Sequence, residues 1–345
     1  MILLEDYQRR NMKKNILFSL FLSLLILYAC TGGEQGKKRA RIVASKGLPS
    51  ELLLVVDKAI WESDLADSIK ALVYGPVPGL PQAESFFRVT QILSPYYRQI
   101  YTTMHSQLFI HLEKGLKKPV LGISYDVVAR PQIQVTLKAG TLDQLRTFLS
   151  SRGEHIRNVI EDAQLDMRQS ALLKKHSPRV SADLEAVLGM TIKAPEQIRA
   201  TKKGKDFLWA GTNLNEKDQN IVIYTYAWDG GDALTPWNFA QKRDSVMRQN
   251  IPGSEPDQWM QTTREEGIPV MTSVIREMGG HVVQEVHGLW EMRNGALGGP
   301  FVSLCRIDTL GNRVIAAEGF VYSPSTDKRE LVRELEASLR TLSAF

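Results

Sequence analysis

The apolar run at residues 16–29 limits which parts of this chain can belong to a folded domain. It has 14 residues, whereas a helix needs about 20 to cross a bilayer. Lys13 and Lys14 precede it, in the way that basic residues precede the apolar segment of a signal peptide. We therefore predict that residues 1–29 are a cleaved signal peptide, with Met12 as the natural start of translation.

The apolar run ends in Leu27-Tyr28-Ala29-Cys30, which resembles the lipobox of bacterial lipoprotein precursors, although Tyr28 is bulkier than the usual residue. This pattern predicts cleavage before Cys30 and lipidation of its thiol, which anchors the chain to a membrane. Residues 30–47 are rich in Gly, Lys and Arg and have no apolar periodicity. We expect them to form a flexible basic tether that adheres to anionic head groups.

The positive charge of the chain is concentrated near its N-terminus. The formal net charge is +5, and residues 1–47 alone carry a net +6, so the remainder is close to neutral. Proteins that bind nucleic acid neutralise phosphates with clustered Lys and Arg, and we therefore expect no nucleic-acid partner. Glu34 is the one acidic residue that closely follows Cys30. The predicted location is the outer membrane, with the domain facing the periplasm.

Once Cys30 is lipidated, Cys305 is the only remaining cysteine, so the mature chain cannot form an intrachain disulfide. Cys305 lies in the strand-like run 301–307. We expect a buried, unreactive thiol there rather than a nucleophile.

From residue 48 onwards, strand and helix patterns follow one another in an order that occurs twice. Each half is expected to contain a strand, a helix, four strands and a closing helix. Local signals support the pattern: Thr141 precedes a helical stretch, Pro236 opens another, and Gly279-Gly280 suits a hairpin turn.

We therefore predict an α+β fold with two similar subdomains, each an antiparallel sheet with packed helices, and duplication as one origin of that similarity. The alternative is a single continuous α+β domain. The expected divisions are a first subdomain at 48–178, a connecting helix and hairpin at 179–218, and a second subdomain at 219–345.

Candidates for metal binding are few. His281, Glu285 and His287 share one face of a predicted strand, because side chains alternate along it. At strand rise the two histidines lie about 20 Å apart, too far to share a metal ion. We expect Glu285 and His287 to form a surface pair, and we predict no metal or cofactor.

Candidates for catalysis are equally few. Ser325 and Lys328 have the Ser-x-x-Lys spacing of some acyl-enzymes. Their position before the last predicted helix has a simpler explanation, in which Ser325 or Thr326 caps that helix. We therefore predict no catalytic residue.

Residues 288–303 form the most unusual stretch of the chain. Gly295, Gly298 and Gly299 follow a predicted strand and imply a bend or a close backbone approach. The bend would present Arg293 and Asn294 beside Trp290, and we single out these three residues as a possible binding loop. The alternative is a crossover between strands without a ligand.

The same stretch carries a resemblance to an uncharacterised family of Bacteroidetes lipoproteins. Further matching segments extend over residues 48–342: 129–132, 242–244, 250–253, 260–262 and 318–324 with Lys328-Arg329. The resemblance implies an envelope lipoprotein with this domain as its sole module. It implies no activity, cofactor or catalytic residue.

Three functions are compatible with these observations. The first is a non-enzymatic binding or assembly module that contacts an envelope protein or a cell-wall component. The second is an envelope hydrolase acting on a cell-wall or glycan substrate. The third is a small-molecule-binding lipoprotein, which a deep pocket between the two halves would favour.

Lipidation of Cys30 predicts a simple labelling result. Metabolic labelling with a palmitate analogue should tag the wild-type protein and leave Cys30→Ala unlabelled, because the substitution removes the acylated thiol. Equal labelling of both proteins would show that the anchor lies elsewhere.

Overall fold

The computed structural model describes residues 42–345. The predicted signal peptide, Cys30 and most of the predicted tether lie outside the described residues. Near the end of the predicted tether, Val43–Ala44 form the short strand β1. Within the described part of the chain, no helix combines the length and apolar character needed to cross a membrane.

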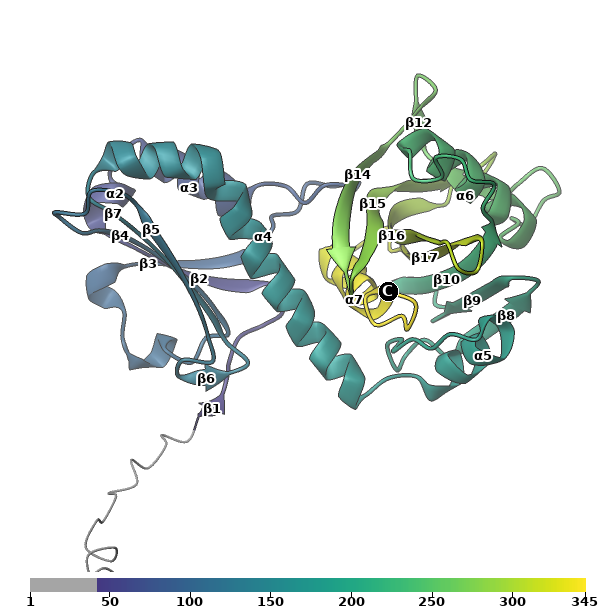
Figure 1. The fold of residues 1–345 in the computed structure, drawn as a ribbon, viewed down its shortest axis with the longest axis horizontal. Helices are drawn as coiled ribbons and strands as arrows, with labels where there is room; N and C mark the ends of the chain where they lie inside the picture. Colours follow the sequence, from purple (N-terminus) through teal and green to yellow (C-terminus); the bar gives the residue numbers. More distant parts are fainter. Residues whose placement is uncertain (1–41) are drawn as a thin grey trace, which may run out of the picture. The chain divides into compact units, whose positions relative to one another are not determined.

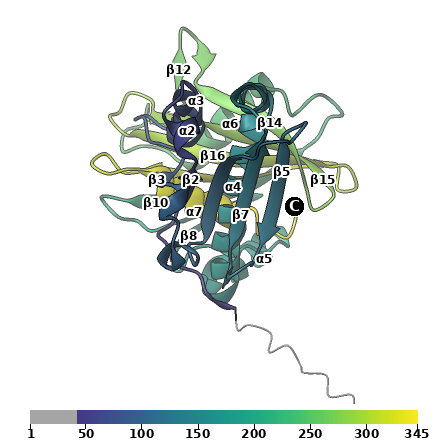
Figure 2. The ribbon, with the colours of Figure 1, turned by 90° about the vertical axis from the view of Figure 1, so that its left-hand side faces the viewer.

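The first subdomain contains a five-stranded sheet, seen in Figure 2. Its order is β3-β2-β4-β7-β5, and only β5 runs antiparallel to its neighbour. The strands and short elements are β2 (Glu51–Val56), β3 (Arg88–Leu93), β4 (Ser106–Leu112), β5 (Val120–Tyr125), β6 (Ala129–Arg130), β7 (Ile133–Ala139) and the 3-10 turns η1 (Ser94–Tyr96) and η2 (Gln99–Tyr101). The helices are α2 (Lys58–Trp61), α3 (Leu65–Tyr74) and α4 (Leu142–Lys174).

The α+β class is confirmed, but the antiparallel sheet expected for the first half is corrected to a mixed, mainly parallel one. Helices α2 and α3 connect β2 to β3 and return the chain to the same end of the sheet, which makes the two strands parallel. A buried strand such as β2 shows the same apolar run in either kind of pairing, so the sequence pattern does not reveal the direction.

Helices α3 and α4 cover one face of this sheet, and their apolar residues join the strands in a single core. The N-terminus of α4 forms as its sequence predicts: the Thr141 hydroxyl accepts a hydrogen bond from the Gln144 amide at 3.2 Å. Helix α4 continues beyond the sheet and contacts α7 (Arg329–Leu339) of the second subdomain (Figure 1).

The second subdomain is built on an eight-stranded antiparallel sheet, as predicted. Its order is β11-β15-β16-β17-β10-β9-β8, with β14 also paired to β15. Segment 179–218, expected as a connection, supplies nearly all of α5 (Pro178–Leu188) and the β8–β9 hairpin. This hairpin extends the sheet because β9 pairs with β10. The strands are β8 (Ala200–Gly204), β9 (Phe207–Gly211), β10 (Asp218–Ala227), β11 (Met260–Thr262), β14 (Met271–Met278), β15 (His281–Met292), β16 (Gly298–Asp308) and β17 (Arg313–Tyr322), with the small ribbon β12 (Arg264–Glu265) and β13 (Ile268–Pro269) beside them.

The two sheets therefore differ in strand order and direction, and the predicted similarity of the halves does not extend to their topology. In the second half, α5 (Pro178–Leu188) and α7 pack on one face of the sheet, and α6 (Pro236–Asn250) packs on the other. Gly319 lets α7 approach closely, since a Cβ there would lie 2.6 Å from Leu335 Cβ.

The N-terminus of α7 is capped by a residue of the first subdomain. The Glu84 carboxylate accepts hydrogen bonds from the amides of Lys328 and Arg329, at 2.7 and 3.0 Å. The expectation that Ser325 or Thr326 caps this helix is therefore wrong. A carboxylate satisfies two free amides and also complements the helix dipole.

A buried ion pair lies on the α6 face of the second sheet. Arg243 of α6 and Glu318 of β17 are both fully buried, and the guanidinium donates two hydrogen bonds to the carboxylate, at 2.8 and 2.7 Å. Thr262 accepts a third bond, and the guanidinium stacks 4.1 Å from the Phe301 ring. The pair is thus desolvated but fully partnered.

Breaking this pair should destabilise the protein strongly. Arg243→Met leaves the Glu318 charge buried without a partner, which should lower the free energy of unfolding by about 3–5 kcal/mol. Arg248→Met, which changes an exposed arginine of the same helix, should cost less than about 1 kcal/mol. Urea denaturation of both variants measures the difference, and equal small losses would contradict a structural role for the pair.

Candidate functional site

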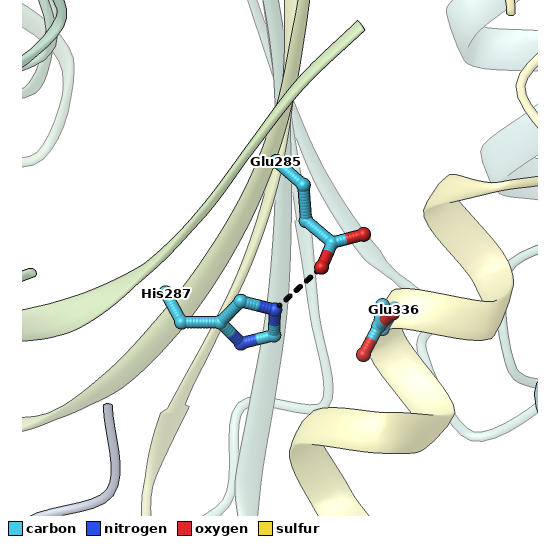
Figure 3. A group of neighbouring side chains, drawn as sticks. All are labelled: Glu285, His287 and Glu336. Carbon is cyan, nitrogen blue, oxygen red and sulfur yellow. Dashed lines mark hydrogen bonds and ion pairs between the residues drawn. The ribbon is translucent and has the colours of Figure 1, made fainter. Parts of the chain in front are cut away.

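Strand β15 and helix α7 bring three ionisable side chains together. Glu285 and His287 occupy the face of β15 towards α7, and Glu336 extends from α7 towards them (Figure 3). One nitrogen or oxygen atom from each lies within 4.8 Å of the others, and His287 Nε2 lies 3.2 Å from Glu285 Oε1. The sequence pattern paired Glu285 with His287, but it gave no signal for Glu336, which belongs to a distant element.

Guanidinium groups surround the two carboxylates. Arg340 donates to Glu285 at 3.2 Å and to Glu336 at 2.8 Å, and Arg276 Nε lies 2.8 Å from Glu285 Oε2. The side chain of Glu285 is only 4 % exposed, so the expectation of a surface pair with His287 is wrong. Glu285 is buried and His287 is half-buried, because side chains of α7 lie over this face of β15.

The pKa values follow from this environment. Burial by itself would raise the pKa of Glu285, but His287, Arg340 and Arg276 together hold it at about 2. Burial would lower the pKa of His287, yet the hydrogen bond to Glu285 and the negative charge of Glu336 outweigh it and raise the pKa above its usual value. The imidazolium and the Glu285 carboxylate thus stabilise one another.

These three residues have ligand types that suit a divalent cation. However, Arg340 already bonds to both carboxylates, and Arg276 lies against one of them. A metal ion would have to displace these guanidiniums or share the carboxylates with them. The charge balance therefore favours an ion-pair network over a metal centre.

The cluster forms part of the wall of a cavity of about 320 Å³ between α4, α7 and β14–β15. Glu161 and Asp162 of α4 line the same cavity and pair with Arg333 of α7 and with Arg340, which directly follows this helix. The apolar part of the lining consists of Val77, Pro78, Leu80, Phe86, Leu165, Val274, Ile275 and Val332. The cavity therefore combines a charged surface with an apolar one, as small-molecule sites commonly do.

Other residues considered from the sequence lie apart from this cavity. His281 is exposed at the start of β15. Ser325 bonds to Glu216, whereas the Lys328 ammonium donates to Gln82 and to a backbone carbonyl, so the two do not form a nucleophile–base pair. Cys305 is buried, as predicted, and burial raises the pKa of its thiol to about 12.

The predicted binding loop has a buried and an exposed part. Trp290 is 4 % exposed and its indole N–H donates to the Val321 carbonyl. Gly299 allows the strand backbone to lie close to Val321, since a Cβ at position 299 would lie 2.1 Å from the Val321 carbonyl oxygen. Arg293 and Asn294 are exposed at the turn between β15 and β16. Their role in binding stays a prediction.

Comparisons with known proteins match the two halves separately. Residues 45–172 match a family described as a domain of unknown function, DUF8532, and residues 177–341 match a second one, DUF4837. These matches agree with the predicted resemblance to an uncharacterised family and with two subdomains. No curated protein matches the chain significantly. A solved structure of a point mutant of "Protein Mog1" is similar at 8 % identity and a TM-score of 0.28, over 44 % of this chain and 89 % of that one.

The raised pKa of His287 predicts a pH-dependent contribution to stability. The protonated form gains interactions on folding, so this contribution is present below about pH 6.5 and is lost as the pH rises through the folded pKa. The stability difference between wild type and His287→Gln should therefore shrink from about pH 6 to about pH 9. Urea denaturation across this range measures it.

The exposed His281 provides the control for this experiment. His281→Gln should follow the pH profile of the wild type, because its side chain lies outside the carboxylate cluster. A His287→Gln effect that is the same at every pH would contradict the linkage.

Proposed function

We propose that this protein is a lipid-anchored binding protein of the cell envelope, whose folded part captures a small anionic molecule in the cavity between its subdomains. The observation that carries the proposal is this cavity, with guanidinium groups from both subdomains in its wall. The envelope location rests on the N-terminal sequence pattern and on Cys30.

The size of the cavity supports a small ligand. A volume of about 320 Å³ lies at the lower end of the range of about 300–1,000 Å³ found for small-molecule sites. The apolar lining can cover the non-polar part of such a ligand, and the charged lining can bind its polar group.

Unused hydrogen-bond donors support an acceptor-bearing ligand. The Nε–H groups of Arg157 and Arg340 are buried and meet no acceptor among the described residues. Arg157 Nε lies 3.6 Å from the nearest Glu161 oxygen, and its guanidinium stacks 4.2 Å from the Phe86 ring. Buried donors without a partner are costly, and a carboxylate or phosphate oxygen would satisfy them if the two arginine side chains turn their Nε–H groups towards the cavity on binding.

Protonation of His287 supports a negative charge on the ligand. The cavity is lined by five arginines and five acidic residues: Arg157, Arg276, Arg329, Arg333, Arg340, Glu154, Glu161, Asp162, Glu285 and Glu336. The formal charges of these ten residues sum to zero, so protonation of His287 gives the lining a net positive charge. An anion should therefore bind more tightly as the pH falls and His287 is protonated.

Binding is favoured over catalysis by the chemistry of the lining. Among the lining residues Thr272 carries the one hydroxyl, and none is a cysteine or serine. Paired carboxylates can act as nucleophile and acid in glycoside hydrolysis. Here, however, Arg340 bonds to both Glu285 and Glu336, and the pKa of Glu285 is held at about 2, which disfavours its acting as a proton donor.

Thermal denaturation of the full-length chain in detergent tests this proposal, with inorganic phosphate and succinate as probes. A ligand present at about 100 times its Kd stabilises the folded state by about 2.7 kcal/mol. We expect either anion to raise the Tm of the wild type, more at about pH 6 than at about pH 8. Arg157→Gln should abolish the increase, because it removes a donor from the cavity.

Arg152→Gln is the matched control, since Arg152 is an exposed residue of the same helix. It should leave the increase unchanged. Three results would contradict the proposal: no response of the wild type to either anion, an equal response in Arg157→Gln, or stabilisation by Zn²⁺ alone that is lost in His287→Gln. Turnover of a cell-wall substrate by the purified chain would make the protein an envelope hydrolase instead.

A further inference from the structure

A second concave surface lies on the α6 side of the second sheet, away from the charged cavity. It is a groove of about 710 Å³, which we call the aromatic groove. Met260, Trp290 and Phe320 form its floor and are each at most 5 % exposed. Trp209 and Tyr322 are half-buried in its wall.

Two exposed leucines lie at the rim of the aromatic groove. Leu214 is 55 % exposed and Leu297 is 43 % exposed, and both belong to its lining. They come from different segments, the loop before β10 and the turn between β15 and β16. Exposed apolar side chains around an aromatic floor form a patch of the kind that marks interaction sites.

Three cations lie in or beside the aromatic groove, and the one carboxylate of its lining, Asp218, is already bonded to Thr212, Leu214 and Asn220. Arg248 and Arg293 hold their guanidiniums 4.1 and 4.6 Å from the Trp259 ring, rather than against a carboxylate in the described part of the chain. Trp259 directly precedes the floor residue Met260. The ammonium of Lys202, which lines the groove, donates to the Asn250 carbonyl. These three cations are thus available to an incoming negative charge.

This composition is that of a protein–protein interface. Trp, Tyr, Phe, Met and Arg are enriched at interfaces, and hot-spot residues lie in pockets surrounded by a rim that excludes water. The predicted binding loop belongs to this surface, because Trp290 lies in the floor and Arg293 beside it.

We propose that the aromatic groove docks a peptide segment of a partner protein, in which an apolar anchor side chain is flanked by acidic residues. The anchor would contact Trp290 and Phe320, and the acidic residues would pair with Arg248, Arg293 and Lys202. A lipid surface fits less well, because a bilayer cannot enter a concave floor, whereas a single side chain can. The inference is independent of the anion cavity.

Selection of random peptides displayed on phage against the full-length chain in detergent tests the docking surface. We expect the selected peptides to share an aromatic or leucine residue beside Asp or Glu. A synthetic peptide of that consensus, measured by fluorescence anisotropy, should bind Leu297→Ser about tenfold more weakly, or worse. Arg293→Ala should weaken binding and reduce its dependence on salt.

Matched controls separate the groove from other surfaces. Leu310→Ser changes a leucine that is 99 % exposed and lies outside the groove, and Trp237→Ala changes a tryptophan that is 54 % exposed on α6. Both should bind the peptide like the wild type. Arg157→Gln should also leave peptide binding unchanged, since it alters only the anion cavity.

Two outcomes would overturn this inference. The first is the absence of a shared peptide pattern, or a selected peptide that binds Leu297→Ser as tightly as the wild type. The second is binding of the wild type to phosphatidylglycerol vesicles that Leu297→Ser loses, which would assign the surface to a membrane.

Discussion

Helix α7 is the element on which the arrangement of the two subdomains depends. Its first amides donate to Glu84 of the first subdomain. Further along the helix, Arg333 and the C-cap residue Arg340 pair with Glu161 and Asp162 of α4. Its opposite, apolar side is buried against the second sheet through Leu335 and Leu339. One helix thus joins a hydrophobic core on one side to an ion-pair network on the other. A buried charge is tolerated only when it is paired, so these pairs restrict how the two subdomains can meet.

The charged cavity is a consequence of the ion pairs between α4 and the α7 region. The carboxylates and guanidiniums that hold α4 and α7 together also line the space between them, and His287 makes their net charge depend on pH. The groups that stabilise the subdomain contact and those proposed to bind the ligand are therefore partly the same. Ligand binding and the stability of this contact should consequently be coupled.

Strand β15 connects the cavity to the aromatic groove. Because side chains alternate along a strand, Glu285 and His287 lie towards α7, while Val286 and Trp290 belong to the core on the α6 side. The same twelve-residue strand therefore contributes to both candidate sites, on opposite faces of one sheet.

The sequence by itself determined the features that have local causes. Thr141 caps α4, Pro236 opens α6, Gly279-Gly280 turns between β14 and β15, and apolar patterns locate the buried strands and Cys305. Each depends on residues a few positions apart, so a single segment contains the whole signal. The tertiary structure alone decided the parallel direction of the first sheet, the capping of α7 by Glu84, and the contact of Glu336 with Glu285 and His287. These features join distant segments, and an isolated carboxylate in a sequence does not show which partner will compensate its burial.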